Sequence, residues 1–276
     1  MRKNYFEILS EIDLDVTLEL QKLHDLIREP FWNVEIGRSC SLYELISISF
    51  RNYTRRKHFL GLDEFLNEWA SKTNILSQQE RYFCYAELYL DLFSVLMPLD
   101  GGNIKRQTMV VYNQINIVIN TCGYSLERIN DRLIIFEDNV FANEAAQAVS
   151  EFADVKEALS ILEYNHFSNK GNIDRKKEIL IKIASLLEPW RNDLNNNIEF
   201  KGVLKLGNNN KVLAVEKLFR MFNKLNIRHN NEEQELTNMD NNMIEVWYDK
   251  IYTLSLFVIL GKDIAQILAD FNEFVD

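Results

Sequence analysis

The chain has few of the residues that interrupt helices, with nine glycines and three prolines among its 276 residues. Glycine weakens a helix through its backbone freedom, and proline removes a backbone donor and clashes with the preceding turn. Their scarcity disfavours a fold built from many short strands and tight turns. Hydrophobic residues make up 47% of the chain, enough for a substantial core at this length. We therefore expect a mainly α-helical protein.

Cysteine is also scarce, and its spacing argues against a framework of bridges. Cys40, Cys84 and Cys122 lie far apart and form no CxxC pair, so neither a disulfide scaffold nor a zinc site is expected. The sequence lacks a phosphate-binding P-loop, GxGxxG, HExxH and GxSxG. We expect no metal and no cofactor.

The net charge of −10 disfavours a globally basic nucleic-acid binder. The charge is uneven, because residues 231–276 contain ten acidic residues and two lysines and so carry −8 of the total. The other 230 residues are close to neutral. A local basic patch on that near-neutral part remains compatible with an anionic partner.

Membrane and export signals are not evident in the sequence. The segment MRKNYFEILSEIDLD has acids where a signal peptide needs an apolar centre. The most apolar run, residues 251–260, is too short to span a bilayer. We expect a soluble cytoplasmic protein with no membrane partner.

Amphipathic helices are predicted in two packed subdomains, residues 1–97 and residues 104–276, separated at Pro98-Leu-Asp-Gly-Gly-Asn103. Ser41 with Glu44, and Ser77 with Glu80, have the spacing of N-terminal capping boxes. Two short apolar runs flank Asn130-Asp131, which predicts one small β-hairpin at residues 124–136. Residues 211–272 are expected to form the terminal helices.

The most polar junction in the chain is Asn223–Glu233, which contains Arg228 and His229. Arginine presents a fork of donors suited to phosphate, and histidine exchanges a proton near neutral pH. Together they are candidate catalytic residues for cleaving a phosphodiester. In the alternative interpretation, Arg228 caps carbonyls at the end of the preceding helix, and His229 helps to shape the turn.

The order of elements from Lys105 onward resembles bacterial abortive-infection proteins, and the terminal helices are similar to HEPN domains. In that family an arginine followed by a polar residue precedes a histidine by four to six positions. Arg228 followed by His229 matches the first half of this motif, whereas Glu233, Gln234 and Glu235 stand where the histidine belongs. The resemblance implies metal-independent action on RNA and a homodimer formed through the C-terminal helices.

A second basic cluster is a candidate nucleic-acid contact. Tyr53 and His58 are interspersed with four cations, Arg51, Arg55, Arg56 and Lys57. Cations beside an aromatic ring can hold a nucleic-acid backbone and stack a base. The alternative is a solvated helix end, where cations meet the negative end of the helix dipole.

Two functions follow from these patterns. The first is a phage-defence or toxin-type protein that acts on RNA or another nucleic acid through a HEPN-like site. The second is a non-catalytic helical interaction or antitoxin-like regulatory module, which could dock through its acidic C-terminal helix. Under the second function, Arg228 is structural.

Overall fold

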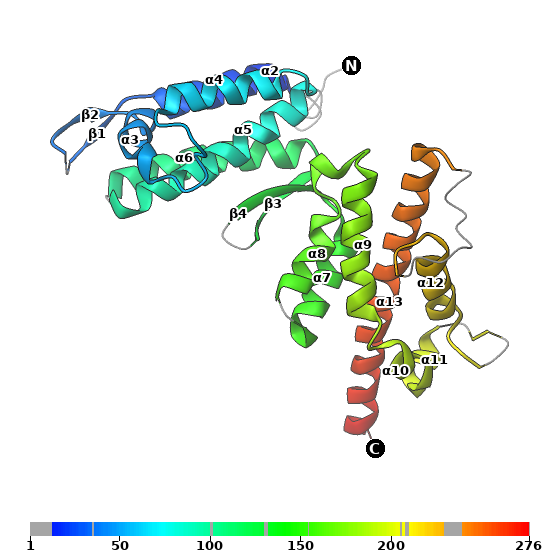
Figure 1. Cartoon of the computed structure of the whole chain (residues 1–276). Coiled ribbons are helices and arrows are strands. Elements are labelled where there is room, and N and C mark those ends of the chain that lie inside the picture. The colour runs from blue at the N-terminus through cyan, green and yellow to red at the C-terminus, as the bar shows by residue number, and fades with distance from the viewer. Residues whose placement is uncertain are drawn as a thin grey trace, which may run out of the picture. The chain divides into compact units, whose positions relative to one another are not determined.

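The structure is a computed structural model that describes residues 13–34, 36–99, 102–129, 132–153, 155–204, 206–207, 210–228 and 239–275. It confirms the mainly α-helical class, with small two-stranded antiparallel sheets beside the helices. The chain forms two compact units, residues 1–135 and 136–276. Each unit has its own buried apolar side chains, and the helices of both are labelled in Figure 1.

The first unit contains a set of helices with two short strand pairs. Its elements are α2 (Val16–Arg28), β1 (Phe31–Asn33), β2 (Arg38–Cys40), α3 (Leu42–Ser49), η1 (Phe50–Asn52), α4 (Leu62–Thr73), α5 (Gln78–Leu92), η2 (Phe93–Leu99), α6 (Gly102–Thr121), β3 (Tyr124–Ile129) and β4 (Arg132–Glu137), whose last two residues lie in the second unit. Helix α2 packs on α5 and α6, and α3 packs on η2 and α2. Buried aromatic and aliphatic side chains fill the space between them.

The predicted helix starts are confirmed at two positions. The Ser77 side chain accepts a hydrogen bond from the Glu80 N–H, and the Glu80 carboxylate accepts one from the Ser77 N–H, so α5 begins in a full capping box. The Ser41 hydroxyl accepts from the Glu44 N–H at the start of α3. These short-range bonds satisfy backbone donors that a helix start would otherwise leave unpaired.

The predicted hairpin is confirmed as β3 and β4, although its turn at Asn130-Asp131 lies outside the described residues. A second pair, β1 and β2, was not predicted. Its strands are three residues long, too short to show an alternating pattern in the sequence. Gly37 stands between them with a φ of 69°, a left-handed conformation that glycine adopts readily.

The boundary between the compact units differs in place from the break predicted at residues 98–103. That break lies inside the first unit, because α6 packs on α2, α3 and α5, and β3 packs on α6. The predicted break therefore falls where η2 gives way to α6 within one core. The division falls between Ile135 and Phe136.

The second unit is helical apart from the end of β4. Its helices are α7 (Val140–Phe152), α8 (Val155–Glu163), η3 (Phe167–Asn169), α9 (Ile173–Leu187), α10 (Arg191–Asn196), α11 (Ile198–Val203), α12 (Leu213–Lys224) and α13 (Asn241–Val275). Residues 140–163 form two helices and not one, because Ala153 takes an extended conformation between α7 and α8. Helix α13 packs against α7, α9, α11 and α12 (Figure 1).

Helix α13 continues through Gly261 without interruption. A Cβ at Gly261 would lie 3.1 Å from the Phe200 ring and 3.4 Å from Leu204, so the missing side chain lets α11 approach α13 closely. The apolar run at residues 251–260 thus belongs to a much longer helix. By length and composition, residues 241–274 could cross a membrane, a test that the core helix of a soluble protein also passes.

A buried cation joins α9 to α13. The Lys176 Nζ lies 2.7 Å from the Glu245 Oε1 and 2.7 Å from the Asp249 Oδ1. The Tyr164 hydroxyl donates to the same Asp249 oxygen at 2.8 Å, and the Gly171 N–H donates to Glu245 at 2.8 Å. Burial disfavours the ionised form of Glu245, but the hydrogen bonds from Lys176 and Gly171 outweigh it and lower the pKa of this carboxyl.

The lowered pKa of Glu245 gives a pH-dependent prediction. The unfolded carboxyl binds a proton more readily than the folded one, so the ionised form stabilises the fold above about pH 4.5, and this stabilisation is lost as the pH falls through the folded pKa. We expect Glu245→Gln to lower the free energy of unfolding by about 1.5–3 kcal/mol at pH 7. Urea titration followed by circular dichroism should show this deficit shrinking towards pH 3.

The matched control is Glu178→Gln. The Glu178 side chain is 61% exposed and pairs with Arg175 only one helical turn away. Exposed pairs of this kind contribute little, so the change should stay below about 0.5 kcal/mol. A Glu245→Gln deficit that is the same at pH 7 and pH 3 would contradict the assigned role of the charge.

Candidate functional site

Arg228 follows the end of α12 and is fixed by contacts within the second unit. Asn226 takes a φ of 53°, which turns the chain, and the Arg228 N–H then donates to the Phe222 carbonyl at 3.3 Å. The guanidinium Nη2 lies 2.5 Å from the Glu188 Oε2, and its carbon is 5.5 Å from the centre of the Phe219 ring. The predicted carbonyl cap is therefore made by the backbone of Arg228, while its side chain pairs with a carboxylate.

Arg228 retains partial access to solvent. Its side chain is 19% exposed and lines a hollow of about 310 Å³ with Ser185, Glu188, Pro189 and Ile227. The charge of Glu188 offsets that of Arg228 inside this hollow. His229 lies outside the described residues, so the pairing of Arg228 with His229 stays a prediction.

A second arginine, Arg191, uses the same aromatic ring. Its guanidinium carbon lies 4.8 Å from the centre of Phe219. It also pairs with Glu216 at 3.4 Å, and Glu216 accepts a hydrogen bond from the Asn195 amide at 3.0 Å. Cations over an aromatic face are attracted by its negative charge density. The guanidinium groups of Arg191 and Arg228, 37 residues apart in sequence, therefore both lie over the ring of Phe219.

A row of cations on α12 lies beside Arg191 and Phe219. Lys217, Arg220 and Lys224 are spaced three and four residues apart, which places them on one side of the helix. The opposite side is buried through Val215, Leu218, Phe219 and Phe222. Lys217 and Arg220 are exposed, and neither forms an ion pair with another described residue. We name Lys217, Arg220 and Lys224 the α12 basic row.

The α12 basic row borders two hollows of the second unit. Lys217 and Arg220 line one of about 380 Å³ with Arg191 and Phe219. All three cations line another, of about 190 Å³, with Trp247. The row was not predicted from the sequence. The three- and four-residue spacing of its cations was the available signal.

The predicted cluster in the first unit is partly used by the fold. Arg55 forms an ion pair with Asp91, and Arg56 donates to the carbonyls of Arg51 and Phe59 at 3.2 and 2.9 Å. Lys57 has a φ of 54°, in the turn that follows. Arg51 and Lys57 are exposed. The structure therefore places Arg51, Arg55, Arg56 and Lys57 close along the chain but assigns Arg55 and Arg56 to internal contacts.

The described residues show neither a metal-ligand cluster nor a reactive thiol at Cys84. No group of three or more histidine, cysteine or acidic side chains there is arranged to hold a metal ion. Burial raises the pKa of the Cys84 thiol to about 12, which keeps it protonated and unreactive at neutral pH.

Comparisons with known proteins give no relatives: no family model, no curated protein and no solved structure matches this chain.

The Arg228–Glu188 pair gives a prediction about stability. We expect Arg228→Met to lower the free energy of unfolding by about 1–3 kcal/mol, because it leaves the carboxylate of Glu188 without its partner. A double-mutant cycle with Glu188→Gln, measured by urea denaturation, should give a coupling energy of about 1 kcal/mol or more.

The control is Arg220→Met on α12, the helix that precedes Arg228. Arg220 is exposed and forms no ion pair with another described residue, so the change should stay within about 0.5 kcal/mol. A coupling energy near zero between Arg228 and Glu188 would contradict the structural role of their ion pair.

Proposed function

We propose that this chain binds single-stranded RNA through the α12 basic row, as a HEPN-like defence protein would. The observation that carries the proposal is the row itself, in which the exposed Lys217 and Arg220 and the half-buried Lys224 lie on one helix face beside Trp247. Single-stranded nucleic acids are held by cations along the backbone and by aromatic rings that stack on bases. The row supplies the cations, and Trp247, with Lys250 4.5 Å from its ring centre, supplies an aromatic ring in the same unit.

Arg191 and Arg228 support this assignment as fixed neighbours of the row. Each is paired with a carboxylate, Glu216 and Glu188 respectively, so they add little net charge. Their position on Phe219 holds the planar guanidinium groups near the mouth of two hollows. A phosphate that approached Arg228 would compete with Glu188 for its donors. RNA binding by the row is therefore separable from RNA cleavage at Arg228.

The row gives a prediction about RNA affinity. Lys217→Glu with Arg220→Glu should weaken binding of a fluorescein-labelled single-stranded RNA at least tenfold at 50 mM salt, because two attractive phosphate interactions become repulsive. The slope of log K against log salt should fall by about 1.4, at about 0.7 for each phosphate that is no longer neutralised. Fluorescence anisotropy measures both quantities, and unlabelled polyglutamate as competitor tests for a general preference for polyanions.

A charge-matched control is Lys72→Glu with Arg106→Glu in the first unit. Both residues are exposed, and the double change alters the net charge by the same amount. It should leave RNA affinity within about twofold. Equally weakened binding in the two double variants would mean that net charge alone governs binding. An absence of binding by the unmodified protein at 50 mM salt would end the proposal.

Cleavage is tested separately by incubating mixed RNA in EDTA with the unmodified protein, Arg228→Ala and Arg228→Lys. A HEPN-like mechanism requires that the unmodified protein cut RNA and that Arg228→Ala lose this activity. Arg228→Lys keeps a cation for Glu188 and so controls for folding. Intact RNA in every reaction would refute ribonuclease activity and would leave RNA binding as the proposed function.

A second candidate function, a helical interaction module, is favoured by the exposed end of α13. Large apolar residues recur there with the three- and four-residue spacing of a coiled coil, and all are partly or fully exposed: Phe257, Leu260, Ile264, Ile267, Phe271 and Phe274. The buried residues Val258, Ile259 and Ala265 lie on the opposite side of the helix. We name the exposed set the α13 seam.

The occupant we propose for the α13 seam is a second copy of the chain in parallel orientation. Asp263 and Asp270 flank the seam on one side, and the exposed Leu268 flanks it on the other, where the equivalent position Gly261 is covered by Phe200. In a parallel pair the two kinds of flank face each other, whereas an antiparallel pair would bring the aspartates together. The helix is already formed by its packing in the second unit, so association bears no helix-nucleation cost.

The seam gives a prediction about assembly. Sedimentation equilibrium should show a concentration-dependent dimer, and Ile264→Asp with Phe271→Asp should shift its dissociation constant at least tenfold upward, because charges would enter the apolar interface. Gln266→Asp with Asn272→Asp adds the same charge on exposed positions off the seam and should change it by less than threefold. A monomer at every protein concentration in the series would refute the self-association.

A further inference from the structure

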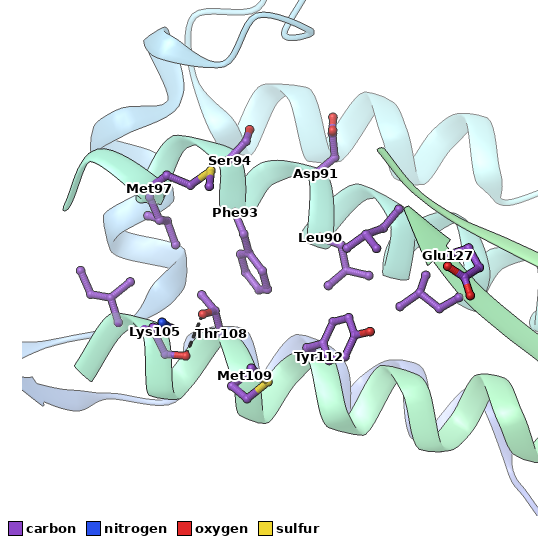
Figure 2. Close-up of a pocket in the computed structure, with 14 residues that line it drawn as sticks. Leu90, Asp91, Phe93, Ser94, Met97, Lys105, Thr108, Met109, Tyr112 and Glu127 are labelled. Atoms are coloured by element: carbon purple, nitrogen blue, oxygen red, sulfur yellow. Dashed lines mark hydrogen bonds between the residues drawn. The ribbon is translucent and has the colours of Figure 1, made fainter. Parts of the chain in front are cut away.

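The first unit contains a cavity of about 700 Å³ that neither proposed function uses. Figure 2 shows it between α5 with η2 on one side and α6 on the other, closed at one end by the β3–β4 hairpin. Leu90, Phe93 and Met97 line the cavity from α5 and η2, and Met109 and Tyr112 line it from α6. A volume of this size is typical of a site for one small organic molecule.

The walls of the cavity are mainly apolar and incompletely covered. Met97 is 75% exposed and Met109 is 50% exposed, and Phe93 and Tyr112 are half-buried. From the hairpin, Leu126 and Leu133 add two further apolar side chains. Methionine adapts its shape to irregular apolar surfaces, and removing such surfaces from water favours binding. The cavity therefore suits a flexible apolar chain.

The polar groups of the cavity differ between its ends. Lys105, on α6, lies at the end away from the hairpin, and Glu127 lies on the hairpin (Figure 2). Lys105 forms no ion pair with another described residue, and its carbonyl is held by the Thr108 hydroxyl at 3.0 Å. Asp91, the other lining carboxylate, is already bound by Arg55 and by the Tyr53 hydroxyl. Its charge is therefore offset.

We propose that this cavity binds a free, single-chain amphiphile with a carboxylate head, placed with the head at Lys105 and the apolar chain along α6 towards Tyr112. Seven residues of helix separate Lys105 from Tyr112, about 10 Å at 1.5 Å per residue, which matches a medium-length chain. Glu127 repels the head from the opposite end and so sets the direction. The volume accommodates one chain, which favours a free acid over a two-chain lipid.

Decanoate is the first probe, measured by isothermal titration calorimetry below its micelle concentration. Decanol and decyltrimethylammonium have the same chain with a neutral and a cationic head. We expect decanoate to bind at least fivefold more tightly than either. Tighter binding of decyltrimethylammonium would overturn the assignment of the head to Lys105, and no binding of any of the three would overturn the cavity as a site.

Two variants locate the site. Lys105→Met should lower the affinity for decanoate at least fivefold, because it removes the cation that pairs with the carboxylate head. The affinity for decanol should stay within twofold. Thr108→Trp places a large side chain in the cavity and should lower the affinities for decanoate and decanol alike. Lys72→Met, an exposed lysine on α4, should change neither affinity. Unchanged decanoate binding in both Lys105→Met and Thr108→Trp would refute the proposal.

A vesicle experiment separates the free acid from a lipid. Flotation with vesicles containing phosphatidylglycerol should leave the protein unbound, whereas Lys105-dependent flotation would replace the free acid with a membrane lipid. Lys105 and Thr108 lie in the first unit, and the α12 basic row lies in the second. Failure of amphiphile binding therefore leaves RNA binding untouched, and the reverse also holds.

Discussion

The second unit depends on one buried cation, the Lys176 side chain, held between two carboxylates of α13. Its Nζ lies 2.7 Å from both Glu245 and Asp249, and its side chain is only 9% exposed. A buried charge needs full pairing because its desolvation costs several kcal/mol. Glu245 and Asp249 are four residues apart and so face α9 together. This contact helps to set the rotation of α13 about its own axis, and so which side chains of α13 face solvent.

The charges of the second unit are divided by helix face. Arg191 and Arg228 are turned towards carboxylates and share the Phe219 ring, whereas the α12 basic row is turned towards solvent. The exposed cations thus lie in the part of the molecule whose sequence is most acidic overall. The position of charges in space, which net charge does not describe, determines what such a surface attracts.

Local features of the fold were predictable, because they depend on residues close together in the chain. The caps at Ser41 and Ser77 and the hairpin at residues 124–136 each depend on fewer than fifteen residues. The compact-unit boundary at Ile135 depends on which helices α6 contacts, and these contacts join distant segments. The break at Ala153 has no proline or glycine to mark it.

The candidate site shows the same limit. Arg228 could be singled out from its neighbours in sequence, but its partner Glu188 is 40 residues away and its aromatic support, Phe219, lies on the preceding helix. The cavity of the first unit combines α5, η2, α6 and the hairpin, so no local pattern predicts it. The spacing of the α12 basic row was visible, and its exposure became clear once the buried face of α12 was known.

Gly261 has a further consequence for the end of α13. Glycine in a helix interior costs about 1 kcal/mol relative to alanine, yet here it permits the Phe200 ring to lie directly against the helix backbone. That ring acts as an angular stop, since turning α13 by one residue, about 100°, would drive a bulky side chain into it. Gly261, a position that has no side chain, therefore helps to fix the direction in which residues 264–274 present their apolar side chains.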